Sequence, residues 1–270
     1  MKQDLSKDQP IGIFDSGIGG LTVANAVSSL LPDERIIYFG DTAHLPYGDK
    51  SADAIRYYCL KIGKFLLEQH CKMIVVACNS ASTAGYDVLL EFFRGQALFV
   101  NVVDPLVAAV AQQQFRKVGL IATKATVQSA VYQKQLRRLQ NDLDVGALAT
   151  PLLAPMIEEG FVHNKVSQVV LDTYLSDPVL YDMEALMLAC THYPLIRPDI
   201  ERYFGESLTI FDSTDVVAQE VRRQLQRAGL LSTQRREAHT FWVSDYTASF
   251  EEATRLFYGQ ALELQQAAIW

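Results

Sequence analysis

Short apolar runs recur along the chain, and polar residues or glycine-containing turns separate them. Runs of this kind are typical of buried strands, above all in parallel sheets, which are covered on both faces. Between several runs the apolar residues instead recur every three or four positions, which indicates amphipathic helices. The strand candidates are residues 11–14, 36–39, 73–77, 98–103, 118–122, 185–189, 208–211 and 241–243.

The clearest helical pattern follows Ser51, where apolar residues from Ile55 to Leu66 recur at helical spacing. Ser51 suits the amino-terminal cap because its hydroxyl accepts a hydrogen bond from the first turn. A second helix is predicted to open at Thr214 and to close at Gly229, since glycine readily adopts the left-handed conformation that ends helices. Further helices are expected over 106–115, 126–139 and 165–175.

The alternation of strands and helices predicts an α/β fold built on mainly parallel sheets. With 270 residues, 49% of them hydrophobic, the chain suffices for one large domain or two ordinary ones. Residues 11–16 resemble 208–213, and residues 75–80 resemble 187–192, but the two motifs occur in reversed order. This order does not support a plain tandem duplication, whereas two similar domains with the chain crossing back remain possible.

Charge and cysteine usage narrow the class of protein. The chain has 24 Lys and Arg against 31 Asp and Glu, a formal charge of −7 with no long run of one sign, which disfavours a nucleic-acid or anionic-membrane surface. The first ten residues are polar and no apolar run approaches a membrane span, so we expect a soluble cytoplasmic protein. The four cysteines lack C-x-x-C spacing, and we expect reduced thiols and no metal site.

Two cysteines follow directly on strand candidates: Cys78 after the run 73–77 and Cys190 after the run 185–189. Residues just past the carboxyl ends of parallel strands line the ligand crevice of α/β proteins. Two thiols facing each other across a small molecule would suit proton removal from one face and delivery to the other, as a racemase requires. Cys59 and Cys71 lack this context, and we interpret both as structural.

The residues after each cysteine can hydrogen-bond a ligand or the backbone. These are Asn79 and Ser80 in the first motif and Thr191 and His192 in the second. Ser80 is expected to start a helix, whose amino terminus would lower the pKa of a nearby thiol. A functional role is favoured for His192 over simple capping. Cysteine phosphatase chemistry requires a C-x5-R loop, which neither motif has.

Residues 15–20 form a glycine-rich turn after the first strand. Its backbone amides would suit an anion, but the segment lacks the lysine of a phosphate-binding P-loop and the spacing of a dinucleotide site. A phosphate, a carboxylate ligand, an acid/base role for Asp15 and a purely structural turn all remain open. The segment 41–48 follows the second strand and is interpreted as another wall of the site.

Taken together, these motifs resemble the glutamate racemases, and the matches run from Gly12 to about Ser213 in the family's order. One departure is visible: Ser80 stands where the family usually has threonine, and the hydroxyl is retained. The motifs that carry the resemblance are Asp15-Ser16-Gly17 with Gly19-Gly20, Pro46-Tyr47-Gly48, Ala77-Cys78-Asn79, 123–126 with Ser129 and Tyr132, 155–158, and Cys190-Thr191-His192-Tyr193-Pro194.

The resemblance implies a cofactor-independent enzyme that interconverts L- and D-glutamate and supplies D-glutamate for peptidoglycan. It implies two similar α/β domains with the active site in the cleft between them, residues 1–101 with 215–270 and residues 102–214, and a possible homodimer. By the same resemblance, the catalytic residues are Cys78, Cys190, Asp15, Glu158 and His192, and the substrate-binding residues are Asp15, Ser16, Pro46, Tyr47, Gly48, Asn79, Ser80, Thr123, Thr191 and His192.

Two other functions compete with this interpretation. The first is a related racemase acting on aspartate or another amino acid, because pocket depth decides which side chain fits. The second is a non-catalytic ligand-binding or regulatory protein on the same fold, which the presence of both cysteines disfavours. Racemisation of L-glutamate without added cofactor would separate them.

Overall fold

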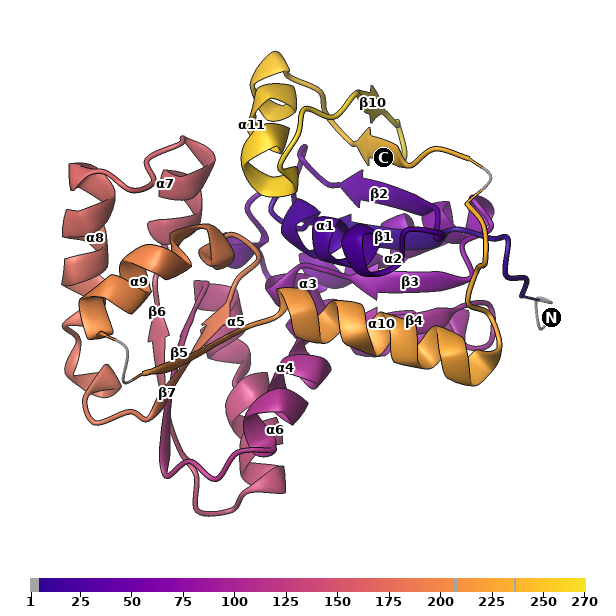
Figure 1. Ribbon diagram of the computed structural model, residues 1–270. Coiled ribbons are helices and arrows are strands. Elements are labelled where there is room, and N and C mark those ends of the chain that lie inside the picture. Colours follow the sequence, from indigo (N-terminus) through magenta and orange to yellow (C-terminus); the bar gives the residue numbers. More distant parts are fainter. Residues whose placement is uncertain (1–4, 206–207, 236) are drawn as a thin grey trace.

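Ten strands form two parallel sheets in the computed structural model, which describes residues 5–205, 208–235 and 237–270. The six-stranded sheet has the order β10-β9-β2-β1-β3-β4, and the four-stranded sheet has the order β6-β5-β7-β8 (Figure 1). The expected α/β class with two parallel sheets is confirmed. The strands are β1 (Ile11–Asp15), β2 (Ile36–Gly40), β3 (Met73–Val76), β4 (Leu98–Asn101), β5 (Lys117–Ala122), β6 (Asp144–Ala149), β7 (Ala185–Ala189), β8 (Thr209–Asp212), β9 (Thr240–Val243) and β10 (Leu264–Gln266).

Helices connect most consecutive strands and cover both sheets, as parallel pairing requires. In the described segments they are α1 (Leu21–Leu30), α2 (Ala52–Glu68), α3 (Asn79–Phe93), α4 (Val103–Ala111), α5 (Lys124–Ser129), α6 (Val131–Leu139), α7 (Leu153–Glu158), α8 (Lys165–Leu175), α9 (Arg197–Phe204), α10 (Thr214–Ala228) and α11 (Ala248–Tyr258), with short 3-10 turns at Tyr47–Asp49, Pro178–Leu180 and Tyr193–Ile196.

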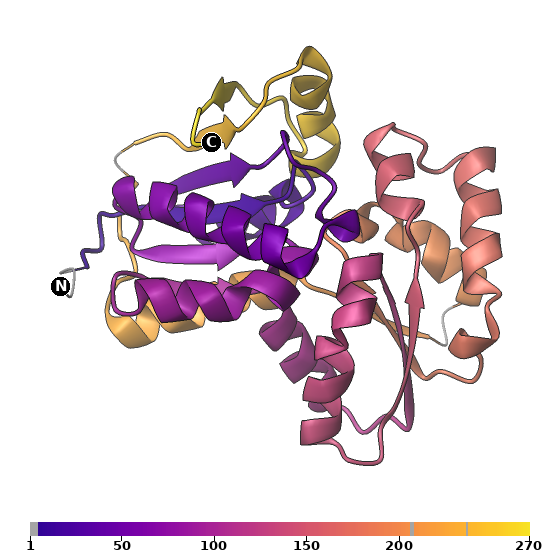
Figure 2. The same ribbon diagram turned by 180° about the vertical axis from the view of Figure 1, so that it is seen from behind.

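The chain crosses between the sheets twice. It builds β1 to β4, then β5 to β8, and returns through α10 to add β9 and β10 to the edge of the first sheet beside β2. Helices α1 and α10 cover one face of the first sheet, and α2 and α3 cover the other, which the view from behind presents (Figures 1 and 2). The chain therefore ends in the sheet in which it began.

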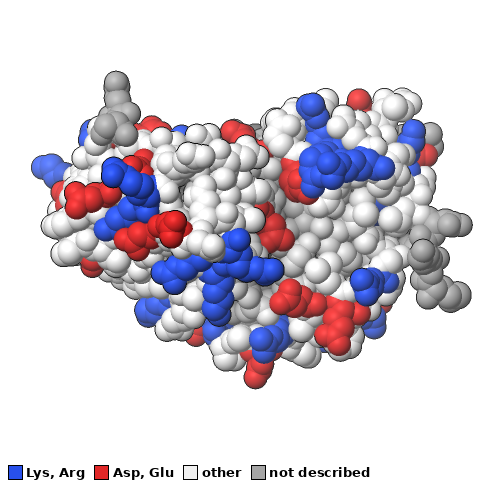
Figure 3. Space-filling view, turned by 90° about the horizontal axis from the view of Figure 1, so that it is seen from below, with Lys and Arg blue, Asp and Glu red and all other residues white. Residues whose placement is uncertain are grey.

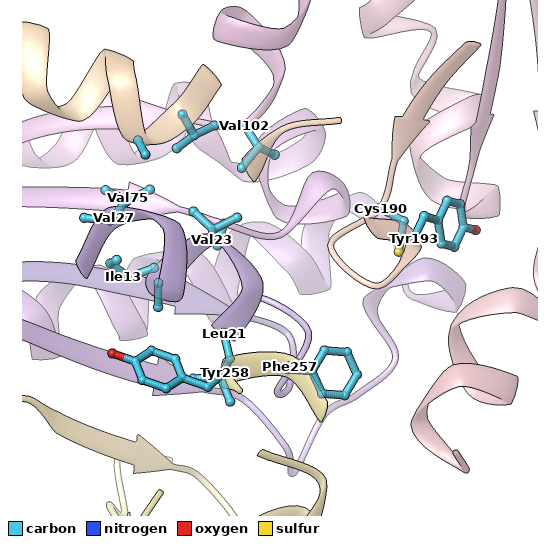
Figure 4. Close-up of a cluster of buried hydrophobic side chains, with 14 of the residues drawn as sticks. Ile13, Leu21, Val23, Val27, Val75, Val102, Cys190, Tyr193, Phe257 and Tyr258 are labelled. Atoms are coloured by element: carbon cyan, nitrogen blue, oxygen red, sulfur yellow. The ribbon is translucent and has the colours of Figure 1, made fainter. Parts of the chain in front are cut away.

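Side chains from both sheets share one continuous core. Cys190 and Tyr193 of the second sheet's side belong to the same buried cluster as Leu21 and Phe257 of the first sheet's side (Figure 4). A hydrogen bond from Thr22 Oγ1 to the Thr191 carbonyl, at 3.0 Å, joins the two sides within this core. The two loops that carry the site motifs are therefore packed against each other.

Local hydrogen bonds set several helix ends. Ser51 caps α2 by accepting from the Ala54 amide, and Gly229 ends α10 in the left-handed conformation, both as predicted. The helix expected over 106–115 instead spans Val103–Ala111, because the Asn101 side chain accepts from the amides of Val103 and Asp104 at 2.8 Å and ends the preceding strand early.

The helix expected over 126–139 is wrong as a single element. It divides into α5 and α6 at Ala130, whose φ of 53° is left-handed. Sequence analysis also missed β6 and β10, each of which is one edge strand of its sheet, whereas the opposite edges, β4 and β8, were predicted. Edge strands are less buried, so they do not need a continuous apolar run.

Acidic and basic side chains are intermixed on the face shown in Figure 3. None of the described helices combines the length and the apolar character that crossing a membrane would require.

Candidate active site

The two motif cysteines lie at the carboxyl ends of strands in different sheets. Cys78 follows β3 and Cys190 follows β7, and each is about 5% exposed. Both line one cavity of about 190 Å³, the size of a small molecule. The cavity is lined by Ser16, Leu45, Pro46, Tyr47, Gly48, Cys78, Asn79, Ser80, Thr123, Ala154, Pro155, Glu158, Cys190, Thr191 and His192.

Cys78 caps the amino terminus of α3. Its Sγ accepts a hydrogen bond from the Ala81 amide at 3.4 Å and lies 3.6 Å from Ser16 Oγ. The helix thus begins at Asn79, one residue before the predicted start at Ser80. Burial and the nearby Asp15 carboxylate raise the pKa of the Cys78 thiol above its usual range, although the helix amide opposes this shift. These surroundings favour the neutral thiol form of Cys78.

Cys190 has a different set of partners. His192 Nδ1 lies 3.6 Å from Cys190 Sγ, and His192 Nε2 lies 2.8 Å from Glu158 Oε1. Burial lowers the pKa of His192, but Cys190 and Glu158 more than offset this effect and hold it well above the usual range for histidine. The thiol, imidazole and carboxylate form a chain along which a proton can be shared.

Hydroxyl and amide groups form another wall. Ser80 Oγ lies 2.9 Å from Thr123 Oγ1, across the gap between the two sheets' strand ends. Asn79 Oδ1 accepts a hydrogen bond from the buried Tyr132 hydroxyl at 2.5 Å, which leaves its Nδ2 without a partner among the described residues. A buried amide without a partner is costly, and a ligand oxygen would satisfy it.

The loop after β2 closes the cavity with Leu45, Pro46, Tyr47 and Gly48. Tyr47 does not offer its hydroxyl to the cavity, because that group donates to Asp41 Oδ2 at 2.6 Å. Its ring and the backbone around it are the surfaces available to a ligand.

Asp15 is fully buried and does not line the cavity. Its Oδ2 accepts from the Gly20 amide at 2.9 Å, so the protein's own carboxylate occupies the anion-binding turn that the sequence indicated. Burial raises the pKa of Asp15, and the nearby His192 lowers it. Asp15 exposes no surface to the cavity, so it has no direct route to a substrate in this structure. Its carboxylate acts on the cavity electrostatically, by raising the pKa of the Cys78 thiol.

Apart from Asp15, every predicted site residue lines the cavity. Sequence analysis missed the apolar lining residues Leu45 and Ala154, although Leu45 lies inside the segment 41–48 that was singled out. It also missed the groups that hold the wall in place, Asp41 behind Tyr47 and Tyr132 behind Asn79. Such supporting contacts join residues distant in sequence, and no local pattern reveals them.

Cys59 and Cys71 are buried away from the cavity. Burial raises the pKa of Cys71 to about 12, and burial with the nearby Cys78 and Asp41 holds the pKa of Cys59 well above its usual range. Among the described residues, no group of three or more His, Cys, Asp or Glu side chains is arranged to hold a metal ion.

Comparison with known proteins assigns the fold and the cavity to a class. The family model for Asp/Glu/hydantoin racemases matches residues 22–221. A glutamate racemase from Chlorobaculum tepidum is 40% identical, with 96% of this chain and 95% of that protein covered. The chain therefore belongs to this racemase family, and within it to the glutamate racemases.

Solved structures agree with this assignment. Glutamate racemase from Francisella tularensis in complex with D-glutamate superposes with a TM-score of 0.91 at 33% identity, covering 97% of this chain and 98% of that one. Glutamate racemase from Thermus thermophilus in complex with β-chloro-D-alanine has a TM-score of 0.87 at 38% identity, again covering 97% and 98%.

Proposed function

We propose that this amino-acid racemase interconverts L- and D-glutamate with Cys78 and Cys190 as its two acid/base groups. The observation that carries the proposal is one small cavity lined by a thiol from each sheet. One thiolate removes the α-proton from one face of the amino acid, and the opposite thiol gives a proton to the other face. The resemblance assigns Cys78 to D-glutamate and Cys190 to L-glutamate.

The partners of Cys190 support its role. The imidazolium of His192 stabilises the Cys190 thiolate that must form before L-glutamate is deprotonated, and Glu158 holds the imidazolium in place. In the opposite direction the same pair can supply the proton that Cys190 delivers.

Cys78 needs a different activation, since burial and Asp15 raise the pKa of its thiol. The α-ammonium group of a bound amino acid brings a positive charge to the buried thiol and lowers its pKa. The amino terminus of α3 acts in the same direction through the Ala81 amide. Substrate binding thus prepares Cys78 for proton transfer, and Asp15 opposes the thiolate until the substrate arrives.

The carbanion intermediate requires hydrogen-bond donors around the carboxylate next to the α-carbon. Asn79 Nδ2 is the buried donor without a partner, and the hydroxyls of Ser80 and Thr123 lie on the same wall. No lysine is found among the described lining residues, so the wall offers no amine for a Schiff base. The carbanion is therefore stabilised by the hydrogen-bond donors of the wall, together with those of Ser16 and Thr191.

The wider role follows from the family. We infer that the enzyme supplies D-glutamate for peptidoglycan in the cytoplasm, with a homodimer as a possible assembly. The proposed domains are residues 1–101 with 215–270 and residues 102–214, a division supported by the two-sheet topology. Aspartate is the alternative substrate; the identity to glutamate racemases over nearly the whole chain favours glutamate.

The test is an assay of purified protein with L-glutamate, L-aspartate and other amino acids, followed by circular dichroism, after dialysis against a chelator and without pyridoxal phosphate. We expect racemisation of glutamate at an undiminished rate. Faster racemisation of aspartate would replace the substrate, and activity that returns only with a metal or pyridoxal phosphate would overturn the cofactor-independent mechanism.

A further inference from the structure

His192 sits on the second sheet's side of the cavity, yet the first sheet's side holds its ring. The Phe257 ring of α11 meets the imidazole edge to face, with centroids 5.2 Å apart and planes at 82°. The backbone at Gly19 approaches so closely that a Cβ there would lie 2.3 Å from His192 Cε1. The hydrogen bond from Thr22 to Thr191 fixes the preceding residue.

We infer that Phe257 is a positioning residue for the Cys190 half of the reaction, acting by holding the imidazole of His192. This inference rests on the proposed two-thiol function. Phe257 does not line the cavity that contains the cysteines, so it acts through His192 and not through the substrate.

The geometry of His192 explains why its ring must be held. Nδ1 faces Cys190 and Nε2 faces Glu158, so a rotation of the ring about its bond to Cβ breaks both interactions at once. A perpendicular aromatic ring in contact with the imidazole blocks that rotation. Phe257 is itself 3% exposed and belongs to the main core cluster, so its own ring is fixed (Figure 4).

The contact is one-sided with respect to the two thiols. Phe257 touches the histidine that serves Cys190, whereas Cys78 depends on α3, Ser16 and Asp15. Loss of the Phe257 ring therefore impairs proton removal by Cys190 and spares proton removal by Cys78. A general loss of packing would affect both half-reactions alike.

Racemisation rates alone cannot show this asymmetry, because the equilibrium constant between enantiomers is one and kcat/KM must fall equally in both directions. A half-reaction can show it. Glutamate analogues with a leaving group on the β-carbon undergo elimination after proton removal, and no second acid is needed.

The experiment compares Phe257→Leu with Tyr258→Leu. Tyr258 is the matched control, since it is the next residue of the same helix, is similarly buried at 7% exposure, and packs on Phe241 instead of on His192. Each variant receives both enantiomers of the analogue. We expect Phe257→Leu to eliminate the L-analogue about tenfold more slowly, as a small misplacement of a catalytic group does, and the D-analogue at nearly the normal rate.

Phe257→Tyr should restore the L-specific rate, because it keeps the aromatic ring that meets the imidazole. Equal losses for both enantiomers, or the same loss in Tyr258→Leu, would overturn the inference while leaving the two-thiol function intact. If Phe257→Leu does not fold, Phe257→Met is judged by the same criteria. A wild-type enzyme that eliminates neither analogue and racemises nothing would instead overturn the proposed function.

Discussion

The two thiols of the cavity have unlike surroundings, and this difference is the main feature at the scale of the residue. Cys190 is next to a protonatable histidine with a carboxylate behind it, whereas Cys78 is next to a buried carboxylate and a helix amide. In the proposed mechanism, Cys190 is assisted by the positive charge of the protein's own His192, and Cys78 depends on the positive charge that the substrate brings.

A first prediction concerns the charge on His192. Its pKa lies well above that of a free imidazole, and removal of the neighbouring carboxylate in Glu158→Gln should lower it. Titration of the five histidines by NMR would measure the change. His239 serves as an internal control, since burial and two arginines lower its pKa to about 4 and Glu158 is not among the causes.

The same shift has a consequence for stability. The folded pKa of His192 exceeds its unfolded value of about 6.5, so protonation stabilises the fold fully below that pH and progressively less as pH rises through the folded pKa. The difference in free energy of unfolding between wild type and Glu158→Gln should shrink over that window. An unchanged His192 titration in the variant would contradict the proposed thiol–imidazole–carboxylate chain.

A second prediction separates the structural cysteines from the catalytic ones. Cys71→Ser places a hydroxyl in a buried apolar site and should cost about 1–3 kcal/mol of stability while kcat stays near normal. Cys78→Ser should instead abolish racemisation while the stability stays near normal, because serine is a good helix cap at this position but a poor base. Urea unfolding and the racemisation assay give the two readouts. A folded Cys71→Ser protein without activity would refute the assignment.

At the scale of the element, two loops built on strand ends make the site. The turn between β1 and α1 packs directly against the loop after β7, and Gly19 is a point of close approach between them. A side chain there would collide with both His192 and Thr191, so the position requires glycine for reasons of space.

A third prediction follows for this contact. Gly19→Ala should displace the His192 ring and lower kcat by about 100-fold or more, since small displacements of catalytic groups have effects of that size. Gly17→Ala is the control in the same turn, because its Cβ would meet only Leu45 atoms, the nearest at 3.6 Å. Steady-state kinetics of the two variants give the comparison. Similar activity in both would mean that the close approach does not position the histidine.

Burial accounts for part of what the sequence predicted, although the half-buried edge strand β8 was predicted as well. Central strands such as β1 and β7 are continuous apolar runs, and they were identified with the cysteine at the end of β7. Edge strand β6 contains Asp144 and half-buried small residues, which gave no such signal. The break at Ala130 was missed because a left-handed alanine follows from tertiary packing and not from local propensity.

In the candidate site, too, some features could be predicted from the sequence and others could not. Residues of contiguous motifs were predicted, and the structure brings them together in one cavity. The contacts that position them, such as Tyr132 on Asn79 and Phe257 on His192, join residues more than 50 positions apart. The resemblance led us to expect that Asp15 touches the substrate. A sequence cannot show that the Asp15 carboxylate instead turns inward to the Gly20 amide.

At the scale of the whole molecule, the path of the chain places one thiol on each side of the cavity. The chain leaves the first sheet after β4 and returns to it after β8. The two sheets are packed so that the carboxyl ends of β3 and β7 contribute to one site. In the proposed mechanism each cysteine serves one face of the α-carbon. This division of labour is the central claim about the enzyme.

Elimination from β-substituted glutamate analogues by Cys78→Ala and Cys190→Ala tests this claim most directly, because it reports proton removal at each face separately. Cys78→Ala should retain elimination of the L-analogue by Cys190, and Cys190→Ala should retain elimination of the D-analogue by Cys78, while neither variant racemises glutamate. Equal elimination of both enantiomers by both variants would show that a single base serves both faces, and the two-thiol mechanism would have to be abandoned.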